Sequence, residues 1–196
     1  MNADTTKHPE QRVAIFADVQ NMYYSAKNLY SGKVDFGRIL TESVGNRRLV
    51  RAFAYVIKAD VGLEKEFFDA LTQRGYEVKA KELQIFIDGS KKGDWDVGLC
   101  MDVVRMLPKI DVMVLISGDG DYIHLLQYAK SQGVRTEVVA FSKTGSTKLF
   151  DEADDVIDMC ADPKKYIIRK PRIPFIPKGV EPKPKNNAGA AKNDKS

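Results

Sequence analysis

Hydrophobic and polar residues alternate in blocks along the chain, and each block has the length of a strand or a helix. Apolar runs at residues 13–18, 49–57, 111–118 and 135–141 have the length and composition of buried strands. Segments with helical spacing separate them, and several end at a glycine or a proline, as helices commonly do. The pattern therefore predicts strands that alternate with helices.

Six helices and two further strands complete this prediction. The helices are expected at 21–30, 36–44, 62–75, 93–109, 121–133 and 144–154, and the strands at 76–83 and 155–159, the latter at an edge. Strands that alternate with helices over short loops form parallel βαβ units. We therefore predict a doubly wound, Rossmann-like α/β domain of three layers, with a central and mainly parallel sheet.

The composition changes near residue 163. Residues 163–196 hold ten Lys or Arg and two acids, a net charge of +8. The whole chain has a net charge of +4, so residues 1–162 have a net charge of −4. We expect a flexible N-terminus at 1–11, a domain at 12–162, and a basic, proline-rich and disordered tail at 163–196. A domain with net negative charge would repel a polyanionic partner. A metal site built from acidic side chains would explain why such a domain is acidic.

The overall composition is that of a soluble globular protein, with 43% hydrophobic and 30% charged residues. No apolar run approaches the roughly 20 residues of a membrane span, and the first dozen residues lack the apolar core of a signal peptide. We expect a cytoplasmic protein without membrane contact. Cys100 and Cys160 form no CxxC pair and are interpreted as reduced, structural residues.

Several carboxylates are expected at one edge of the sheet, because ligands bind at the carboxyl ends of parallel strands. Asp18 ends the first strand, and Asp119 follows the strand at 111–118. At 100° per residue, Asp96 and Asp121 fall on the apolar, inward-facing arcs of their helices. On the helix predicted at 21–30, Asn21 lies on the side that also carries Met22, Ser25 and Leu29, which is expected to face inward.

Helix capping is the competing explanation for each of these residues. It explains Asp119 well, but it does not require Asp96 or Asp121 to face inward, and it does not explain Asp18 at a strand end. Four ionised carboxylates about 5 Å apart would repel by about 3 kcal/mol per pair at an effective dielectric near 20. Protonation or a bound cation would relieve this repulsion, and oxygen ligands favour Mg²⁺ or Mn²⁺.

Three segments together resemble the NYN domain family, in its LabA-like branch. They are VAIFADVQNMYYSA, KKGDWDVGLCMDVV and LISGDGDYIHLLQYAKSQGVRTEVVAF, within residues 12–160. The resemblance implies a PIN-like fold with the first strand central, and a metal-dependent ribonuclease that acts on RNA with Mg²⁺ or Mn²⁺. It implies a catalytic set of Asp18, Asn21, Asp96, Asp119 and Asp121. Asp18, Asp96 and Asp119 would hold the metal, and Asp121 and Asp102 are further candidates. Asp102 lies at the border of its inward arc.

Other residues are candidates for contact with the substrate. Lys91 and Lys92 would contact phosphate, or else form a solvated loop. Trp95 would stack a base or pack at its helix start, and Ser117 would orient a carboxylate or a phosphate or simply end its strand. In the tail, Arg169, Lys170 and Arg172 would bind RNA or belong to a solubilising linker.

Two other functions are considered. A phosphatase of the haloacid dehalogenase type has a similar late motif, but it needs a second Asp where this chain has Gln20. A non-catalytic RNA-binding or scaffold domain would retain the same fold. The sequence leaves the RNA target, the pathway and the oligomeric state open, and a homodimer is one option.

Overall fold

The computed structural model describes residues 7–58, 64–82, 84–85, 91–92 and 94–168. Within them the central sheet has six strands in the order β4-β3-β1-β7-β8-β9, and every neighbouring pair is parallel. The strands are β1 (Arg12–Asp18), β3 (Arg48–Lys58), β4 (Glu77–Glu82), β7 (Val112–Ile116), β8 (Arg135–Ala140) and β9 (Asp155–Asp158). The predicted fold class is confirmed, and β1 lies inside the sheet as expected.

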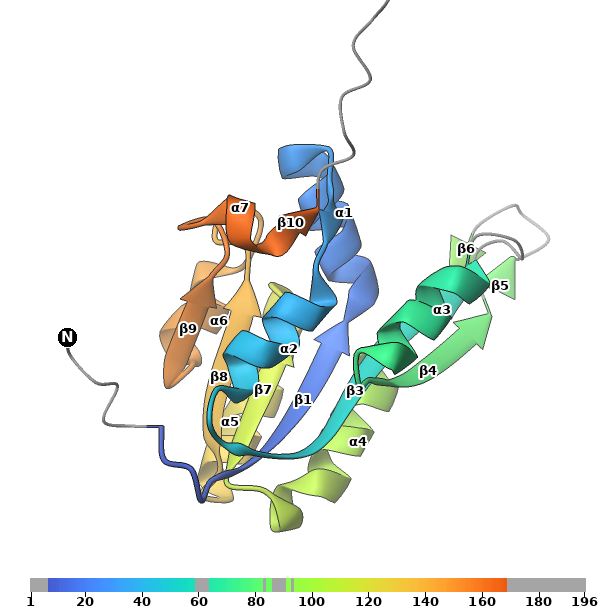
Figure 1. Ribbon diagram of the computed structural model, residues 1–196. Helices are drawn as coiled ribbons and strands as arrows, with labels where there is room; N and C mark the ends of the chain where they lie inside the picture. Colours follow the sequence, from blue (N-terminus) through green and yellow to red (C-terminus); the bar gives the residue numbers. More distant parts are fainter. Residues whose placement is uncertain (1–6, 59–63, 83, 86–90, 93, 169–196) are drawn as a thin grey trace, which may run out of the picture.

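Helices cover both faces of this sheet (Figure 1). One face carries α1 (Val19–Tyr30), α2 (Phe36–Val44) and α3 (Glu64–Gln73), and the other carries α4 (Asp96–Met106), α5 (Ile123–Ser131) and α6 (Thr147–Glu152). Two short 3-10 helices, η1 (Leu107–Lys109) and η2 (Gly120–Tyr122), follow α4 and precede α5. The domain therefore has three layers.

Successive residues of β1 point into different hydrophobic cores. Val13, Ile15 and Ala17 belong to the core under α1 and α2, whereas Ala14 and Phe16 belong to the core under α4 and α5. All five are fully buried. A parallel strand that is buried on both faces reads as a continuous apolar run, which is why this strand could be predicted.

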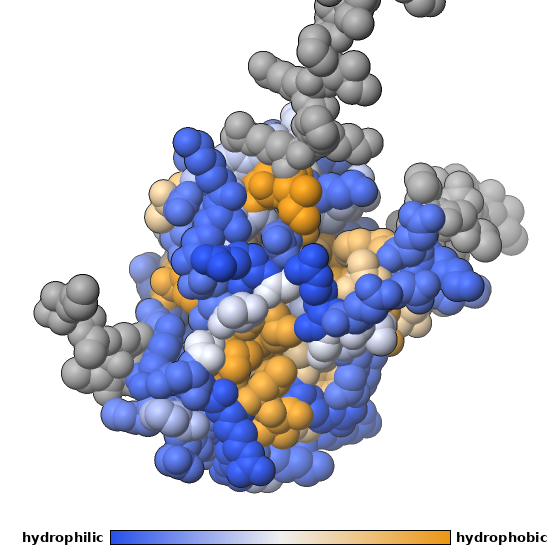
Figure 2. Space-filling view, in the orientation of Figure 1, coloured by the Kyte–Doolittle hydropathy of each residue, from blue (hydrophilic) through white to orange (hydrophobic). Residues whose placement is uncertain are grey.

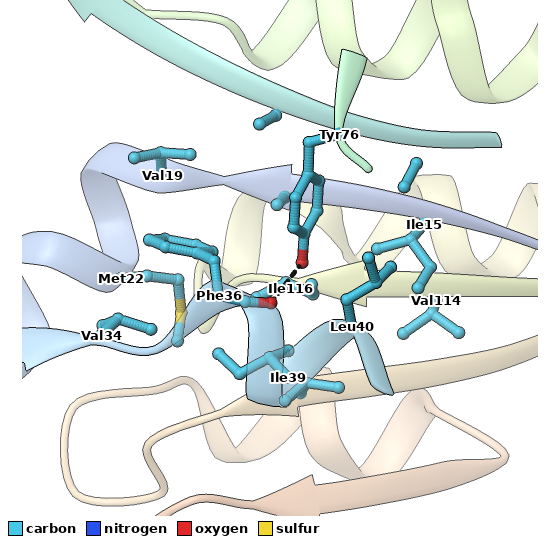
Figure 3. Close-up of a cluster of buried hydrophobic side chains, with 14 of the residues drawn as sticks. Ile15, Val19, Met22, Val34, Phe36, Ile39, Leu40, Tyr76, Val114 and Ile116 are labelled. Atoms are coloured by element: carbon cyan, nitrogen blue, oxygen red, sulfur yellow. Dashed lines mark hydrogen bonds between the residues drawn. The ribbon is translucent and has the colours of Figure 1, made fainter. Parts of the chain in front are cut away.

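Figure 3 shows the core on the side of α1 and α2, where aliphatic and aromatic side chains fill the space between the helices and the sheet. Tyr76 is 2% exposed, and its hydroxyl donates a 3.0 Å hydrogen bond to the carbonyl oxygen of Phe36. Apolar residues also reach the surface in the view of Figure 2. At the start of β3, Leu49 and Val50 are 38% and 37% exposed. The helices therefore cover the sheet incompletely.

Four two-residue strands and one helical turn were not predicted from the sequence. β2 (Lys33–Val34) pairs with β10 (Ile167–Ile168), and β5 (Gln84–Ile85) pairs with β6 (Lys91–Lys92). The helical turn α7 (Pro163–Tyr166) precedes β10 and buries Tyr166. The fold thus continues six residues past residue 162, because Tyr166 and Ile167 complete the core on this side. Among the described helices, none is long and apolar enough to span a membrane.

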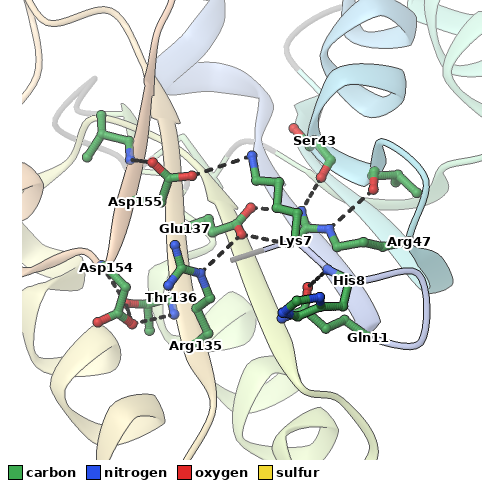
Figure 4. Close-up of polar contacts among 12 residues, drawn as sticks. Lys7, His8, Gln11, Ser43, Arg47, Arg135, Thr136, Glu137, Asp154 and Asp155 are labelled. Carbon is green, nitrogen blue, oxygen red and sulfur yellow. Dashed lines mark hydrogen bonds and ion pairs between the residues drawn. The ribbon is translucent and has the colours of Figure 1, made fainter. Parts of the chain in front are cut away.

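A buried ion pair joins the segment between α2 and β3 to strand β8 (Figure 4). The guanidinium of Arg47 donates to both carboxylate oxygens of Glu137, at 2.6 and 2.8 Å, and also to the carbonyl oxygens of Ser43 and Val44. Arg47 is 5% exposed and Glu137 is 1% exposed. Such a pair need not add stability over an apolar pair, but removing one charge leaves the other buried alone.

We therefore expect Glu137→Gln to lower the free energy of unfolding by about 3 kcal/mol, because Arg47 keeps its charge in the interior. Urea denaturation measures this change. The control is Glu77→Gln, which breaks the exposed pair of Glu77 with Arg51 and should cost at most about 1 kcal/mol. Equal losses in the two variants would contradict this account of the pair.

Candidate active site

A pocket of about 340 Å³ opens at the carboxyl edge of the sheet, between the starts of α1 and α4. Asp18 enters it from the end of β1, Asp96 from the first residue of α4, and Asp119 from the loop after β7. Parallel strands bring these residues together because their carboxyl ends share one edge. The predicted grouping of three aspartates around one space is present in the structure.

Asp18 is held through both of its carboxylate oxygens. Oδ1 accepts the backbone N–H of Asn21 at 3.0 Å, so Asp18 is the N-cap of α1. Oδ2 lies 3.5 Å from the hydroxyls of Ser117 and Tyr122. Burial raises the pKa of Asp18 to about 6, and the negative charges of Asp96 and Asp119 add to this, against the hydrogen bond from Asn21. Capping does explain Asp18, contrary to the sequence-based argument.

Tyr122 connects two of the aspartates, and no sequence pattern pointed to it as a site residue. Its hydroxyl donates to Oδ1 of Asp96 at 3.0 Å and also faces Asp18. Burial and the two carboxylates raise the pKa of Tyr122, so the hydroxyl keeps its proton and acts as a donor. Burial also raises the pKa of Asp96, as do the charges of Asp94, Asp119 and Asp121, while the Tyr122 hydrogen bond opposes this.

Hydrogen bonds that the side-chain oxygens of Asn21 and Ser117 accept fix the loop after β7. The side-chain oxygen of Asn21 accepts the backbone N–H of Gly118 at 3.0 Å, and Ser117 Oγ accepts that of Asp119 at 3.2 Å. A Cβ on Gly118 would lie 2.8 Å from Cα of Gly145, so the loop passes close to a neighbouring loop here. Ser117 Oγ also lies 3.5 Å from Oδ2 of Asp18, and its role in orienting a carboxylate or a phosphate stays a prediction.

The inward orientation predicted for Asp121 is wrong. Asp121 is exposed and does not line the pocket, and the neighbouring Tyr122 is buried instead. Residues 120–122 form the 3-10 helix η2, in which each residue turns by about 120° instead of 100°. A continuous α-helix, which the prediction assumed, starts only at Ile123.

Asp102 also does not belong to this pocket. Its Oδ2 accepts the hydroxyl of Tyr55 at 3.0 Å and the ammonium of Lys79 at 2.5 Å. Burial would raise the pKa of Asp102, but the hydrogen bonds from Lys79 and Tyr55 outweigh it and hold the pKa below its usual value. Asp102 is thus already neutralised by protein groups, because it lies on a different side of α4 from Asp96.

Trp95 packs in the wall of the pocket. Its indole N–H donates to the carbonyl oxygen of Val56 at 2.8 Å, and its ring lies 5.4 Å from that of Tyr55. This contact agrees with the packing interpretation of Trp95. The side chains of Lys91 and Lys92 lie outside the described residues, as do all of Arg169, Lys170 and Arg172.

The chemistry of the pocket fits a hard divalent cation. Asp18, Asp94, Asp96 and Asp119 line it, whereas no Lys, Arg or His does among the residues described. Oxygen donors of this kind suit Mg²⁺ or Mn²⁺. In the described parts of the chain, however, no three Asp, Glu, His or Cys side chains are already arranged to hold an ion. The donor set is therefore suitable, and the carboxylates would have to adjust to bind one.

Comparison with known proteins places this site in a family. Residues 12–160 match the model of the NYN domain. The chain belongs to the NYN domain family. NYN domains are PIN-like nucleases and generally depend on divalent metals, so membership supports a function of the ribonuclease type. It gives no support to the haloacid dehalogenase alternative.

Individual relatives agree with this assignment. The protein LabA ("Low amplitude and bright protein LabA") of Synechococcus elongatus is 29% identical over 175 residues, which cover 84% of this chain and 92% of LabA. An uncharacterized protein of Methanocaldococcus jannaschii is 25% identical over 76% of this chain and 55% of its own length. The crystal structure of a Vibrio parahaemolyticus protein of unknown function superposes with a TM-score of 0.75 at 29% identity, covering 86% of this chain and all of that one.

The raised pKa of Asp18 makes the stability of this NYN domain depend on pH. A carboxyl with a pKa of about 6 in the fold, above its value in the unfolded chain, stabilises the fold at low pH, and this contribution is lost as the pH rises through 6. Without divalent metal, we expect Asp18→Asn to be more stable than the original chain at pH 7.5, by about 3 kcal/mol, because the pKa rises from 3.8 to about 6. The difference should disappear near pH 4, because Asp18 is then protonated.

Asn retains the N-cap at this position, so the substitution isolates the charge. Urea denaturation in EDTA at the two pH values measures the difference. Asp69→Asn, at an exposed position of α3, is the control and should show no pH-dependent difference. An Asp18→Asn variant less stable than the original chain at pH 7.5 would show that the charge is not the dominant cost.

Proposed function

We propose that this protein is a ribonuclease dependent on Mg²⁺ or Mn²⁺, which hydrolyses RNA phosphodiester bonds by attack of water. The observation that carries the proposal is the convergence of Asp18 and Asp96 on the hydroxyl of Tyr122, in an acidic pocket of an NYN domain. Two carboxylates that face one hydroxyl repel each other, and the described lining offers no basic side chain to offset this.

Asp18, Asp96 and Asp119 would hold the cation at the carboxyl edge of the sheet. When bound, such a cation lowers the pKa of the attacking water and stabilises the leaving oxygen of the phosphodiester. Tyr122 would orient Asp96, and Ser117 would orient Asp18. Asn21 would keep the β7 loop, and with it Asp119, against the start of α1. Asp121, which is exposed, would act only through its charge.

Attack of water on phosphorus that breaks the P–O3′ bond leaves the phosphate on the 5′ oxygen, and the departing 3′ oxygen takes up a proton. The proposal therefore predicts products with a 5′-phosphate and a 3′-hydroxyl. We expect purified protein to cut RNA in Mg²⁺ or Mn²⁺ and EDTA to abolish the cleavage. Asp96→Asn should lower kcat by several orders of magnitude while RNA still binds, because it removes one of the charges that would hold the cation. Gel analysis of labelled RNA measures both rate and end groups.

Asp102→Asn is the matched control, since this aspartate lies on the same helix but outside the pocket. It should keep most of the activity. If the original chain and Asp96→Asn degrade RNA equally, the activity comes from a contaminating ribonuclease. If Asp102→Asn is as inactive as Asp96→Asn, the proposed metal ligands are the wrong set.

A non-catalytic RNA-binding protein is the second candidate function. The observation in its favour is that, among the described residues, no three carboxylates are already arranged around one ion. Binding of RNA without cleavage by either the original chain or Asp96→Asn, in both metals, would establish this alternative. We further propose that the protein acts in the cytoplasm.

The basic C-terminal segment is proposed to contribute to RNA binding through Arg169, Lys170 and Arg172. Residues 169–196 contain eight Lys or Arg and two acids. Truncation after Ile168 keeps β10 and α7 and should weaken RNA binding, because fewer phosphates are neutralised. Affinity measured from about 50 to 200 mM salt should show a flatter slope. An unchanged affinity and slope would leave the segment as a linker.

A further inference from the structure

A row of side chains on α1 continues the pocket away from the aspartates. Gln20, Tyr24 and Asn28 are spaced four residues apart, so they lie along one side of the helix, and all three line the pocket. Asp18 stands at the start of this row. Tyr24 is six residues further on, about 9 Å along the helix axis. The row therefore begins at the proposed catalytic aspartates and leads outward.

Tyr24 differs from the buried tyrosines of the domain. Tyr55, Tyr76 and Tyr122 are at most 2% exposed, and each hydroxyl donates a hydrogen bond of 3.0 Å. Tyr24 is 51% exposed, and within the described chain its hydroxyl has no hydrogen-bond partner. Its ring meets the ring of Tyr23 edge to face, with centroids 5.4 Å apart. The internal packing of the domain thus does not account for this aromatic residue in a pocket wall.

The neighbouring Tyr23 is exposed to a similar degree, at 45%, but does not line the pocket. It lies one turn before Lys27 on the helix, and the Lys27 ammonium is 5.7 Å from its ring centroid. A general tendency of α1 to expose aromatic residues therefore does not explain the row. Unlike Tyr23, Tyr24 lies between the carboxamides of Gln20 and Asn28 in the wall of the pocket that the aspartates line.

The chemistry of the row suits a nucleobase. An aromatic ring stacks on any base, and such a contact is a common way to hold unpaired RNA. The carboxamides of Gln20 and Asn28 both donate and accept hydrogen bonds, which matches the mixed donors and acceptors on base edges. The row carries no positive charge, so it is not suited to bind a phosphate by itself.

We propose that Tyr24, with Gln20 and Asn28 beside it, forms a nucleobase subsite that stacks one unpaired base next to the cleaved phosphodiester. The inference rests on the proposed ribonuclease function and specifies its substrate as single-stranded RNA or an unpaired loop. A base within a duplex is stacked on both faces and cannot reach Tyr24 without being unpaired.

The test measures binding of a labelled single-stranded oligoribonucleotide to the full chain by fluorescence anisotropy. The Asp96→Asn background keeps the RNA intact. Tyr24→Ala should weaken binding about 5- to 150-fold, the usual effect of losing one aromatic–base stack. Tyr24→Phe keeps the ring and should bind within about twofold of the parent. Tyr128→Ala, at a position on α5 that is 45% exposed and outside the pocket, should also leave binding unchanged.

A second series replaces each nucleotide of the oligonucleotide in turn by an abasic one. At one position, the loss of the base should weaken binding to the parent by the same factor as Tyr24→Ala. At that position the same loss should cost the Tyr24→Ala protein nothing, because the stacking partner is already absent. A merely structural role of Tyr24 would not produce this coupling.

The outcomes separate the inference from the function on which it rests. If Tyr24→Ala binds RNA as the parent does, or if abasic costs are equal in both proteins, the subsite is wrong even where the original chain cuts RNA. If the coupling is found but the original chain cleaves no RNA, the subsite stands and belongs to an RNA-binding protein. If the parent binds no single-stranded RNA at all, both proposals fail.

Discussion

The carboxylate of Asp18 joins three parts of the molecule at the carboxyl edge of the sheet. It ends β1, caps α1 through Asn21, and faces the hydroxyls of Ser117 on the β7 side and Tyr122 before α5. The remaining site geometry depends on these contacts, because Asn21 in turn holds Gly118 and Tyr122 in turn holds Asp96. One acidic side chain thus fixes where the first helix, the central loop and α4 meet.

The same carboxylate is unfavourable as a charge. Its burial and the nearby Asp96 and Asp119 raise its pKa to about 6, so near neutral pH it is ionised at a cost to the fold. In contrast, Glu137 is buried more deeply but is paired with Arg47, which satisfies both of its oxygens. Among the described residues, the buried carboxylate of Glu137 is neutralised by Arg47, whereas the aspartates that line the pocket have no basic side chain in the lining beside them. A site that takes up a cation has this property.

Much of this arrangement follows from the sequence because it depends on strand ends. The continuous apolar runs before Asp18 and Asp119 place both residues at one edge of a parallel sheet. The orientation of Asp121 and Tyr122 could not be predicted in the same way, because residues 120–122 form a 3-10 helix that turns by about 120° per residue instead of the 100° assumed. The pairing of β2 with β10 joins two-residue strands more than 130 residues apart, and such short strands carry no periodic signal. The place of Tyr24 in the pocket wall could not be predicted either, because residues far apart in the sequence, from Asp18 to Thr144, line that pocket together.

We expect a divalent cation to bind between the carboxylates of Asp18, Asp96 and Asp119. Crystals of the full chain soaked in Mn²⁺ and measured at the manganese absorption edge would show the position of such an ion directly. We expect an anomalous difference peak within bonding distance of carboxylate oxygens of Asp18 and at least one of Asp96 and Asp119. The peak should be absent in Asp18→Asn crystals of the same form. No peak in this pocket at millimolar Mn²⁺, or a peak that persists in Asp18→Asn, would contradict the account.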